Sequence, residues 1–114
     1  MRQIAAGVVL GLMALPAAGE EWRPLTSDEI AGVLTERTVL YEDIGDQTFF
    51  ASGRTLYRVV RDNWGWWEAR DNQYCSLWPP QEEWACFSVN LSADGTRVQF
   101  VGENDDISEG TFEE

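Results

Sequence analysis

A chain of 114 residues is long enough for one small domain with a modest core and too short for two. Its 20 acidic residues against 8 basic ones give a formal net charge of −12, so nucleic acid and anionic membrane surfaces are poor partners. The sequence contains no histidine and no lysine, which excludes Ser-His-Asp and Cys-His catalysis, Schiff-base chemistry and a lysine-bearing phosphate loop within this chain.

The first 19 residues have the pattern of a secretory signal peptide. Arg2 supplies a positive start, an apolar run extends from Ile4 to Leu15, and the small residues that follow favour cleavage after Gly19. The apolar run is shorter than the roughly 20 residues of a bilayer span, and no second apolar stretch follows it. We therefore expect a periplasmic or secreted protein with no membrane span after cleavage.

The two cysteines, Cys75 and Cys86, are separated by ten residues. Export places them where disulfides form and persist, so we expect them to be bridged. Their spacing differs from the C-x-x-C spacing of redox-active dithiols, which favours a structural disulfide over a catalytic one.

Residues after Leu25 predict a short helix. Thr26 followed by Glu29 is a capping box, in which each residue can satisfy an amide of the other. An apolar stripe then lies at helical spacing, formed by Ile30, Val33 and Leu34. A helix from about Ser27 to Leu34 is too short to be stable alone, so it must pack against another element.

The remainder of the chain reads as short strands separated by turn signals. Strands are expected at residues 38–41, 48–50, 55–60, 65–69 and 85–91, with a last strand that includes Val98 and Phe100. If Cys75 faces Cys86 in an antiparallel pair, Tyr74 falls opposite Phe87 on the core face.

Short strands every 8 to 12 residues without crossover helices predict a mainly β protein of the α+β class. We expect a short N-terminal helix and an antiparallel meander that forms a curved sheet or small barrel, with a β-sandwich as the alternative. The predicted organisation is a signal peptide at residues 1–19, one disulfide-stapled domain at 20–102 and an acidic flexible tail at 103–114, with Ile107 and Phe112 as possible exceptions in the tail.

The chain is rich in tryptophan, and the distribution of its six tryptophans is informative. Five of them fall within residues 64–84, around the cysteines. Most large rings in a small domain fill its core, and the neighbours Trp66 and Trp67 must point to opposite faces of a strand. We expect the binding residues among Trp66, Trp67, Trp78 and Trp84, in a hairpin loop that Pro79 and Pro80 stiffen. An exposed aromatic shelf there could bind a partner protein or a small hydrophobic or sugar ligand.

Carboxylate chemistry is the catalytic option that the composition leaves open. Glu42, Asp43, Asp46, Glu68, Glu82 and Glu83 could provide an acid and a base, yet no pair stands out. The acidic residues from Glu103 to Glu109 do not match an EF-hand loop. We therefore expect no catalytic residue, no metal site and no cofactor.

The helix opening Leu25–Ile30, the strand Gly65–Trp67 and the pattern Tyr74-Cys75-x-x-Trp78 with Trp84-x-Cys86-Phe87 carry a resemblance. Over most of residues 25–101 they resemble small exported proteins of proteobacteria that are known as domains of unknown function. Gly-x-Trp followed by the two cysteines is also similar to lipocalin-like folds. The resemblance implies a periplasmic location and a cystine-stapled sheet, and it implies no activity.

These observations favour a non-enzymatic periplasmic binding or interaction protein that uses the tryptophan-rich hairpin. Two alternatives stay open. One is a small-ligand carrier with a lipocalin-like pocket inside the curved sheet, and the other is a carboxylate-dependent hydrolase.

Overall fold

The computed structural model describes residues 21–114, so the predicted signal peptide at residues 1–19 lies outside the described residues. The elements in chain order are β2 (Trp22–Pro24), α1 (Ser27–Leu34), β3 (Arg37–Tyr41), β4 (Gly45–Phe49), β5 (Arg54–Arg58), β6 (Asp62–Arg70), β7 (Gln73–Leu77), β8 (Ala85–Ser92), β9 (Arg97–Val101), the 3₁₀ turn η2 (Glu103–Asp105) and β10 (Ile107–Phe112).

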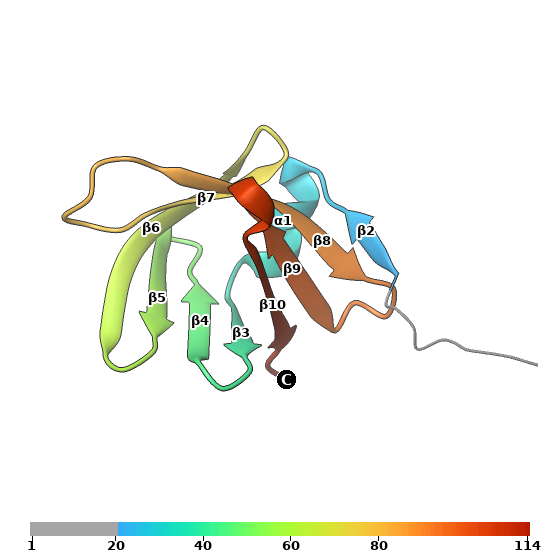
Figure 1. Ribbon diagram of the computed structural model, residues 1–114, viewed down its shortest axis with the longest axis horizontal. Coiled ribbons are helices and arrows are strands. Elements are labelled where there is room, and N and C mark those ends of the chain that lie inside the picture. The colour runs from blue at the N-terminus through green and yellow to red at the C-terminus, as the bar shows by residue number, and fades with distance from the viewer. Residues whose placement is uncertain (1–20) are drawn as a thin grey trace, which may run out of the picture.

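Strands β3 to β10 form an antiparallel meander that closes into an eight-stranded barrel within residues 21–114 (Figure 1). Each strand pairs with the next along the chain, and β10 closes the sheet by pairing with both β9 and β3. Strand β2 pairs with the second half of β8, beyond the segment that pairs with β7. The predicted small barrel is therefore confirmed, and the alternative β-sandwich is not formed.

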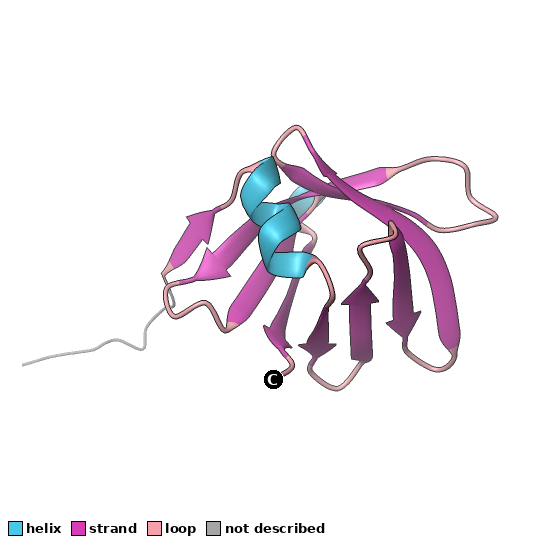
Figure 2. Ribbon diagram, turned by 180° about the vertical axis from the view of Figure 1, so that it is seen from behind, coloured by secondary structure: helices cyan, strands magenta, loops and turns pink. Residues whose placement is uncertain are grey.

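Helix α1 closes one end of the barrel. In Figure 2, seen from behind, α1 lies in front of the strands, whereas in Figure 1 η2 lies in front of α1. The capping box predicted for Thr26 and Glu29 is present, and the side chains of Ile30 and Leu34 are fully buried beneath the helix. No helix within residues 21–114 has the length and hydropathy that a bilayer crossing requires.

A reciprocal contact fixes α1 to the turn between β6 and β7. The backbone amide of Ser27 donates to Asn72 Oδ1 (2.9 Å), and the amide of Asn72 donates to Ser27 Oγ (2.6 Å). Asp71 and Asn72 both have positive φ, which two-residue hairpin turns require and which Asp and Asn tolerate. The helix is thereby held across the barrel end.

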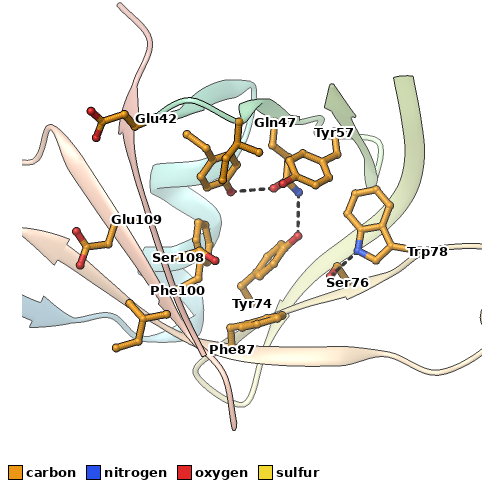
Figure 3. Close-up of a pocket in the computed structure, with 13 residues that line it drawn as sticks. Glu42, Gln47, Tyr57, Tyr74, Ser76, Trp78, Phe87, Phe100, Ser108 and Glu109 are labelled. Atoms are coloured by element: carbon orange, nitrogen blue, oxygen red, sulfur yellow. Dashed lines mark hydrogen bonds between the residues drawn. The ribbon is translucent and has the colours of Figure 1, made fainter. Parts of the chain in front are cut away.

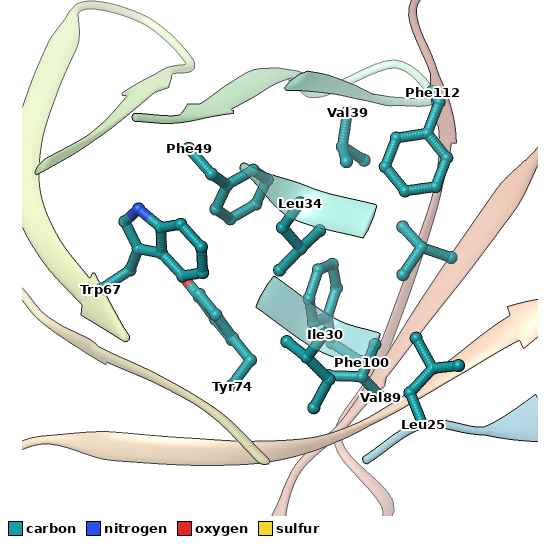
Figure 4. Packing of buried hydrophobic residues seen from close by; sticks show 11 residues of the cluster. Leu25, Ile30, Leu34, Val39, Phe49, Trp67, Tyr74, Val89, Phe100 and Phe112 are labelled. Carbon is teal, nitrogen blue, oxygen red and sulfur yellow. The ribbon is translucent and has the colours of Figure 1, made fainter. Parts of the chain in front are cut away.

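The hydrophobic core fills the half of the barrel next to α1 (Figure 4). Its centre is Phe49, whose ring meets those of Trp67 and Tyr74 edge to face, with centroids 5.6 and 5.7 Å apart. The cluster consists of Leu25, Ile30, Leu34, Val39, Phe49, Trp67, Tyr74, Val89, Val98, Phe100 and Phe112.

The predicted disulfide between Cys75 and Cys86 is present and links β7 to β8. The two cysteines are directly opposite each other, and Tyr74 pairs with Phe87, as the sequence predicted. Arg70 and Trp84 lie beside the disulfide: an Arg70 nitrogen is 3.9 Å from Cys86 Sγ, and its guanidinium is 5.3 Å from the Trp84 ring centroid.

The prediction of a flexible tail at residues 103–114 is wrong, because this segment contains β10. Ile107 to Thr111 pair with β9, Thr111 and Phe112 pair with β3, and Phe112 is part of the core. Among the acidic residues that suggested disorder, Glu103 and Asp105 lie on η2, and Glu109 on β10 binds Arg97 at 3.2 Å. The structured domain therefore extends to Phe112.

Candidate functional site

The barrel end opposite α1 is open, and we call it the mouth. Four connections surround it, at residues 42–44, 59–61, 78–84 and 102–106. The meander brings them together because alternate connections of an antiparallel barrel lie at the same end. The connections at residues 50–53, 71–72 and 93–96 lie at the other end, which α1 closes.

The side chains that face into the barrel change character along its axis. On β3 the inward positions pass from Val39 beside α1 to Tyr41 at the mouth, and on β4 they pass from Phe49 to Gln47. Neighbouring strands follow the same trend, with Thr55 then Tyr57 on β5 and Tyr74 then Ser76 on β7. The apolar core therefore gives way to aromatic and polar groups near the mouth.

A cavity of about 360 Å³ occupies this outer half of the barrel (Figure 3). Six aromatic rings line it, those of Tyr41, Tyr57, Tyr74, Trp78, Phe87 and Phe100. The other lining residues are Glu42, Ile44, Gln47, Ser76, Ile107, Ser108 and Glu109. The volume falls at the small end of the range of about 300–1,000 Å³ that is typical of ligand pockets.

Gln47 organises the polar floor of the cavity. The hydroxyl of Thr55 donates to the carbonyl oxygen of Thr48 (2.8 Å), so its oxygen can only accept from Gln47, and Gln47 Nε2 donates to it at 3.0 Å. The same nitrogen donates to the hydroxyl oxygen of Tyr74 (3.0 Å), while Gln47 Oε1 accepts from the hydroxyl of Tyr41 (2.9 Å). This network fixes the orientation of the amide and of two tyrosine rings.

The floor tyrosines are neutral phenols. Burial raises the pKa of Tyr41 far above its ordinary value, and the nearby Tyr74 and Tyr57 raise it further. Burial also raises the pKa of Tyr74, and the hydrogen bonds with Ser76 and Gln47 only partly oppose this effect. Neither hydroxyl is poised to act as a base near neutral pH.

Trp78 forms one wall of the cavity, and Gly65 on the neighbouring β6 makes room for it. Trp78 Nε1 donates to Ser76 Oγ (3.1 Å), which holds the indole in place. A Cβ atom at position 65 would lie 2.6 Å from Trp78 Cε3 and 2.7 Å from the carbonyl oxygen of Leu77. Gly65 is therefore required by the close approach of the indole.

None of the thirteen lining residues is basic, and two of them are acidic. Glu109 accepts from Arg97 (3.2 Å) and from Gln99 (3.0 Å), and Glu42 has no ion-pair partner among residues 21–114. Figure 3 shows both carboxylates directed away from the tyrosine hydroxyls. They border the cavity and do not converge on a common point inside it.

The structure separates the four tryptophans that the sequence singled out. Trp78 lines the cavity, whereas Trp67 is buried in the core and donates from Nε1 to the carbonyl oxygen of Phe50 (3.0 Å). Trp66 is 43% exposed on the outer wall, and Trp84 is 37% exposed beside the disulfide. Trp66 and Trp67 point to opposite faces because successive residues of β6 face opposite sides of the sheet. Of the four tryptophans, Trp78 is the one that lines the cavity.

An aromatic stack extends along the outer wall instead. The guanidinium of Arg54 lies between Trp64 and Trp66, 4.9 and 4.8 Å from their ring centroids. Phe50 stacks on Trp64 at a centroid distance of 5.9 Å. Arg54 thus contributes to the packing of both exposed indoles.

Sequence reasoning missed most of the cavity. Gln47, Tyr57 and Ser76 were not among the predicted binding residues, although each occupies an inward position of its strand. The available signal was a polar residue two positions away from an apolar inward residue of the same strand, as Gln47 is from Phe49. That signal indicates a cavity only once the barrel is known to close.

The carboxylates considered for catalysis are dispersed. Asp46 binds Arg58 and Glu68 binds Arg70, both on the barrel exterior. Within residues 21–114, no group of three or more acidic or cysteine side chains is placed to hold a metal ion.

Comparisons with protein-family models, with curated proteins and with solved structures find no match to this chain. The resemblance to small exported proteins of proteobacteria therefore stays a prediction.

Proposed function

We propose that this protein is a non-enzymatic binding protein that holds a small amphipathic molecule in the mouth of its barrel. The observation that carries the proposal is the cavity of about 360 Å³ at the mouth. Its aromatic walls suit an apolar body, and the Tyr41–Gln47–Tyr74 network offers polar groups at the floor.

The fixed geometry of the floor supports binding. Gln47 and Thr55 are buried and hydrogen-bonded, so a ligand would meet a surface whose polar groups are already oriented. The indole of Trp78 is held by its hydrogen bond to Ser76 and by its close packing against Gly65. The wall above the floor is therefore also positioned before binding. Such preorganisation lowers the entropy lost when a ligand binds.

The cavity has more support than the tryptophan-rich hairpin that the sequence favoured. Trp78 lines the cavity, whereas Trp66 contacts Arg54 and Trp84 contacts Arg70 outside it. The separation of Glu42 from the hydroxyls, and the pairing of Glu109 with Arg97, give a hydrolytic mechanism little support.

We also propose that the mature protein works in the periplasm or outside the cell. The signal-like first 19 residues support this location, and so does the disulfide between Cys75 and Cys86.

Native mass spectrometry of mature protein, isolated gently from its own periplasm, tests the proposal first. We expect an adduct of a few hundred daltons that is lost on denaturation. Titration with the uncharged fluorophore N-phenyl-naphthylamine provides a second measurement, because its emission rises when it enters an apolar pocket.

Two substitutions locate the bound molecule. Ser108 lines the cavity, so Ser108→Trp should fill the mouth and abolish fluorophore binding. Ser88 is exposed on the outer face of β8, so Ser88→Trp adds the same side chain away from the cavity and should leave binding unchanged. Equal binding by the two variants, or no binding by the unmodified protein in either measurement, would contradict the proposal.

A further inference from the structure

We infer that the molecule held in the cavity is a small organic cation with an alkylated ammonium group. This inference rests on the proposed function and adds the charge of the ligand to it. Three observations on the described residues support it, namely the arrangement of the rings, the absence of basic groups from the lining and the charge around the mouth.

The rings form two connected runs on opposite sides of the cavity. Tyr41, Tyr57 and Trp78 make one run, with centroids 5.9 Å apart for the first pair and 6.0 Å for the second. The other run passes from Phe100 through Tyr74 to Phe87, with centroids 5.1 and 6.1 Å apart. Gln47 joins the two runs through Tyr41 and Tyr74 (Figure 3).

A cage of this kind attracts cations. The face of an aromatic ring carries partial negative charge, and a cation within about 6 Å of several such faces is stabilised by each of them. Alkylated ammonium groups fit best, because their methyl groups contact the rings and their low hydration makes burial less costly. The neutral state of Tyr41 and Tyr74 keeps the cage free of formal charge.

The lining offers nothing that would hold an anion. None of its residues is basic. Arg97, the first residue of β9, follows the connection at the closed end and is paired with Glu109. A carboxylate or phosphate would therefore lose its hydration without gaining an ionic partner. Glu42, at the edge of the cavity, would repel it.

The connections around the mouth are strongly acidic. Those at 42–44, 59–61, 78–84 and 102–106 carry seven carboxylates and one basic residue, Arg61. The carboxylates are Glu42, Asp43, Glu82, Glu83, Glu103, Asp105 and Asp106. Their summed potential raises the local concentration of cations at the only open end of the described barrel.

The test uses three probes of nearly the same shape. Choline carries the positive charge, neohexyl alcohol is its uncharged carbon analogue, and tert-butylacetate is an anion with the same branched end. Proton–nitrogen NMR spectra report binding at the indole N–H of Trp78, whose signal is assigned by its loss in Trp78→Phe. The indole signal of Trp66, on the outer wall, is the internal control.

We expect choline to shift the Trp78 signal with half-saturation at about a tenfold lower concentration than neohexyl alcohol. tert-Butylacetate should be the weakest of the three, and Trp66 should not respond. Equal half-saturation by choline and the alcohol would overturn the charge inference and leave the proposed function standing. Failure of all three probes, together with failure of the uncharged fluorophore, would remove both.

Two pairs of variants separate the causes. Tyr57→Leu removes a ring from the cage and should weaken choline several-fold more than the alcohol, whereas Phe50→Leu removes a ring from the outer wall and should change neither. Glu42→Gln should weaken choline binding two- to threefold, and this loss should be smaller at high salt because salt screens the charge of Glu42. Asp28→Asn removes one charge from α1 at the closed end and should leave choline unchanged. An unchanged preference for choline in both cavity variants would contradict the inference, provided that the Trp67 signal shows an intact core.

Discussion

Gly65 sets the position of the tryptophan side chain that lines the cavity. The indole of Trp78 packs so closely against Gly65 that a Cβ atom at this position would lie 2.6 Å from Trp78 Cε3. The φ angle of Gly65 lies outside the positive range that L-residues avoid, so backbone conformation does not require a glycine here. The glycine is needed because a side chain has no space. The width of the mouth therefore depends on a residue that has no side chain.

Replacing Gly65 by Ala should displace Trp78 and lower the free energy of unfolding by about 1–3 kcal/mol, the usual range for overpacking. Binding of the uncharged fluorophore should fall with it. Gly32 on α1 is the matched control, because a Cβ there meets nothing within 4 Å. Gly32→Ala should raise the free energy of unfolding by about 0.5–1 kcal/mol, since alanine favours the helix. Urea denaturation measures both, and equal effects would contradict this account of Trp78.

Single residues also show why the cavity was difficult to predict from the sequence. Trp78 was predicted as a binding residue on the strength of its size and its neighbours, and the structure places it in the cavity. Gln47 gives no such signal, because one glutamine in a strand normally faces solvent. Its burial follows from its register with Phe49 and from its contacts with three other strands, which local sequence does not reveal.

Strand β10 is the element on which barrel closure depends. It pairs with β9 over five residues, from Ile107 to Thr111, and with β3 through Thr111 and Phe112. Gly110 on this strand is buried against Val39, which would clash with any larger residue. Without β10 the sheet would be open between β3 and β9, with two unpaired edges.

Deletion of residues 107–114 should therefore prevent cooperative folding, even though these residues look like an acidic tail. The loss includes the fully packed ring of Phe112 and the closing hydrogen bonds to β3. Removal of Glu114 alone is the control and should leave the melting temperature unchanged. Circular dichroism during heating measures both, and a cooperative transition in the longer deletion would show that the barrel does not need β10.

The elements differ in how clearly the sequence announces them. Helix α1 was predicted with its bounds because Thr26 and Glu29 form a recognisable cap before an apolar stripe. The β7–β8 hairpin was predicted because its cysteines fix the register. Strand β10 was missed because its inward positions are Ser108, Gly110 and Phe112, of which one alone is apolar. When small inward residues make room for the side chains of a neighbouring strand, the alternation of apolar and polar residues that identifies a strand is lost.

At the scale of the whole molecule, the absence of lysine simplifies the response to alkaline pH. The chain has three tyrosines and no lysine, and its cysteines are bridged, so tyrosines are the side chains that titrate near pH 10 in the unfolded state. The pKa values of Tyr41 and Tyr74 are raised in the folded state, mainly by burial. Above about pH 10 the unfolded chain releases protons that the folded barrel keeps, so stability falls as pH rises.

We expect the free energy of unfolding to decrease by about 1.4 kcal/mol per pH unit for each of these two tyrosines above about pH 10. Urea denaturation at a series of pH values measures the slope. In Tyr41→Phe the slope should be smaller by the contribution of one tyrosine. A free energy of unfolding that stays constant up to about pH 11.5 would show that the two hydroxyls are accessible to hydroxide.

Closure of the barrel is also a property of the whole molecule, and it decides how far sequence can predict function. Most strand positions and the disulfide could be predicted from local sequence, whereas β10 could not. The cavity exists only because strands β3 to β10 close into a barrel. A curved open sheet built from the same strands would expose Gln47 and Tyr57 to water. The sequence therefore predicted the class of fold and left the site to be found in the structure.

Strand β2 begins beside Ser92, and β10 ends where the amide of Phe112 bonds the carbonyl oxygen of Thr96. Both attachment points thus lie at the end that α1 seals. If the C-terminus is fixed to a surface, a sensor chip or a fused protein, the mouth points away from the tether. Orientation is then decided by the fold, and a captured molecule enters and leaves on the side that faces open solution.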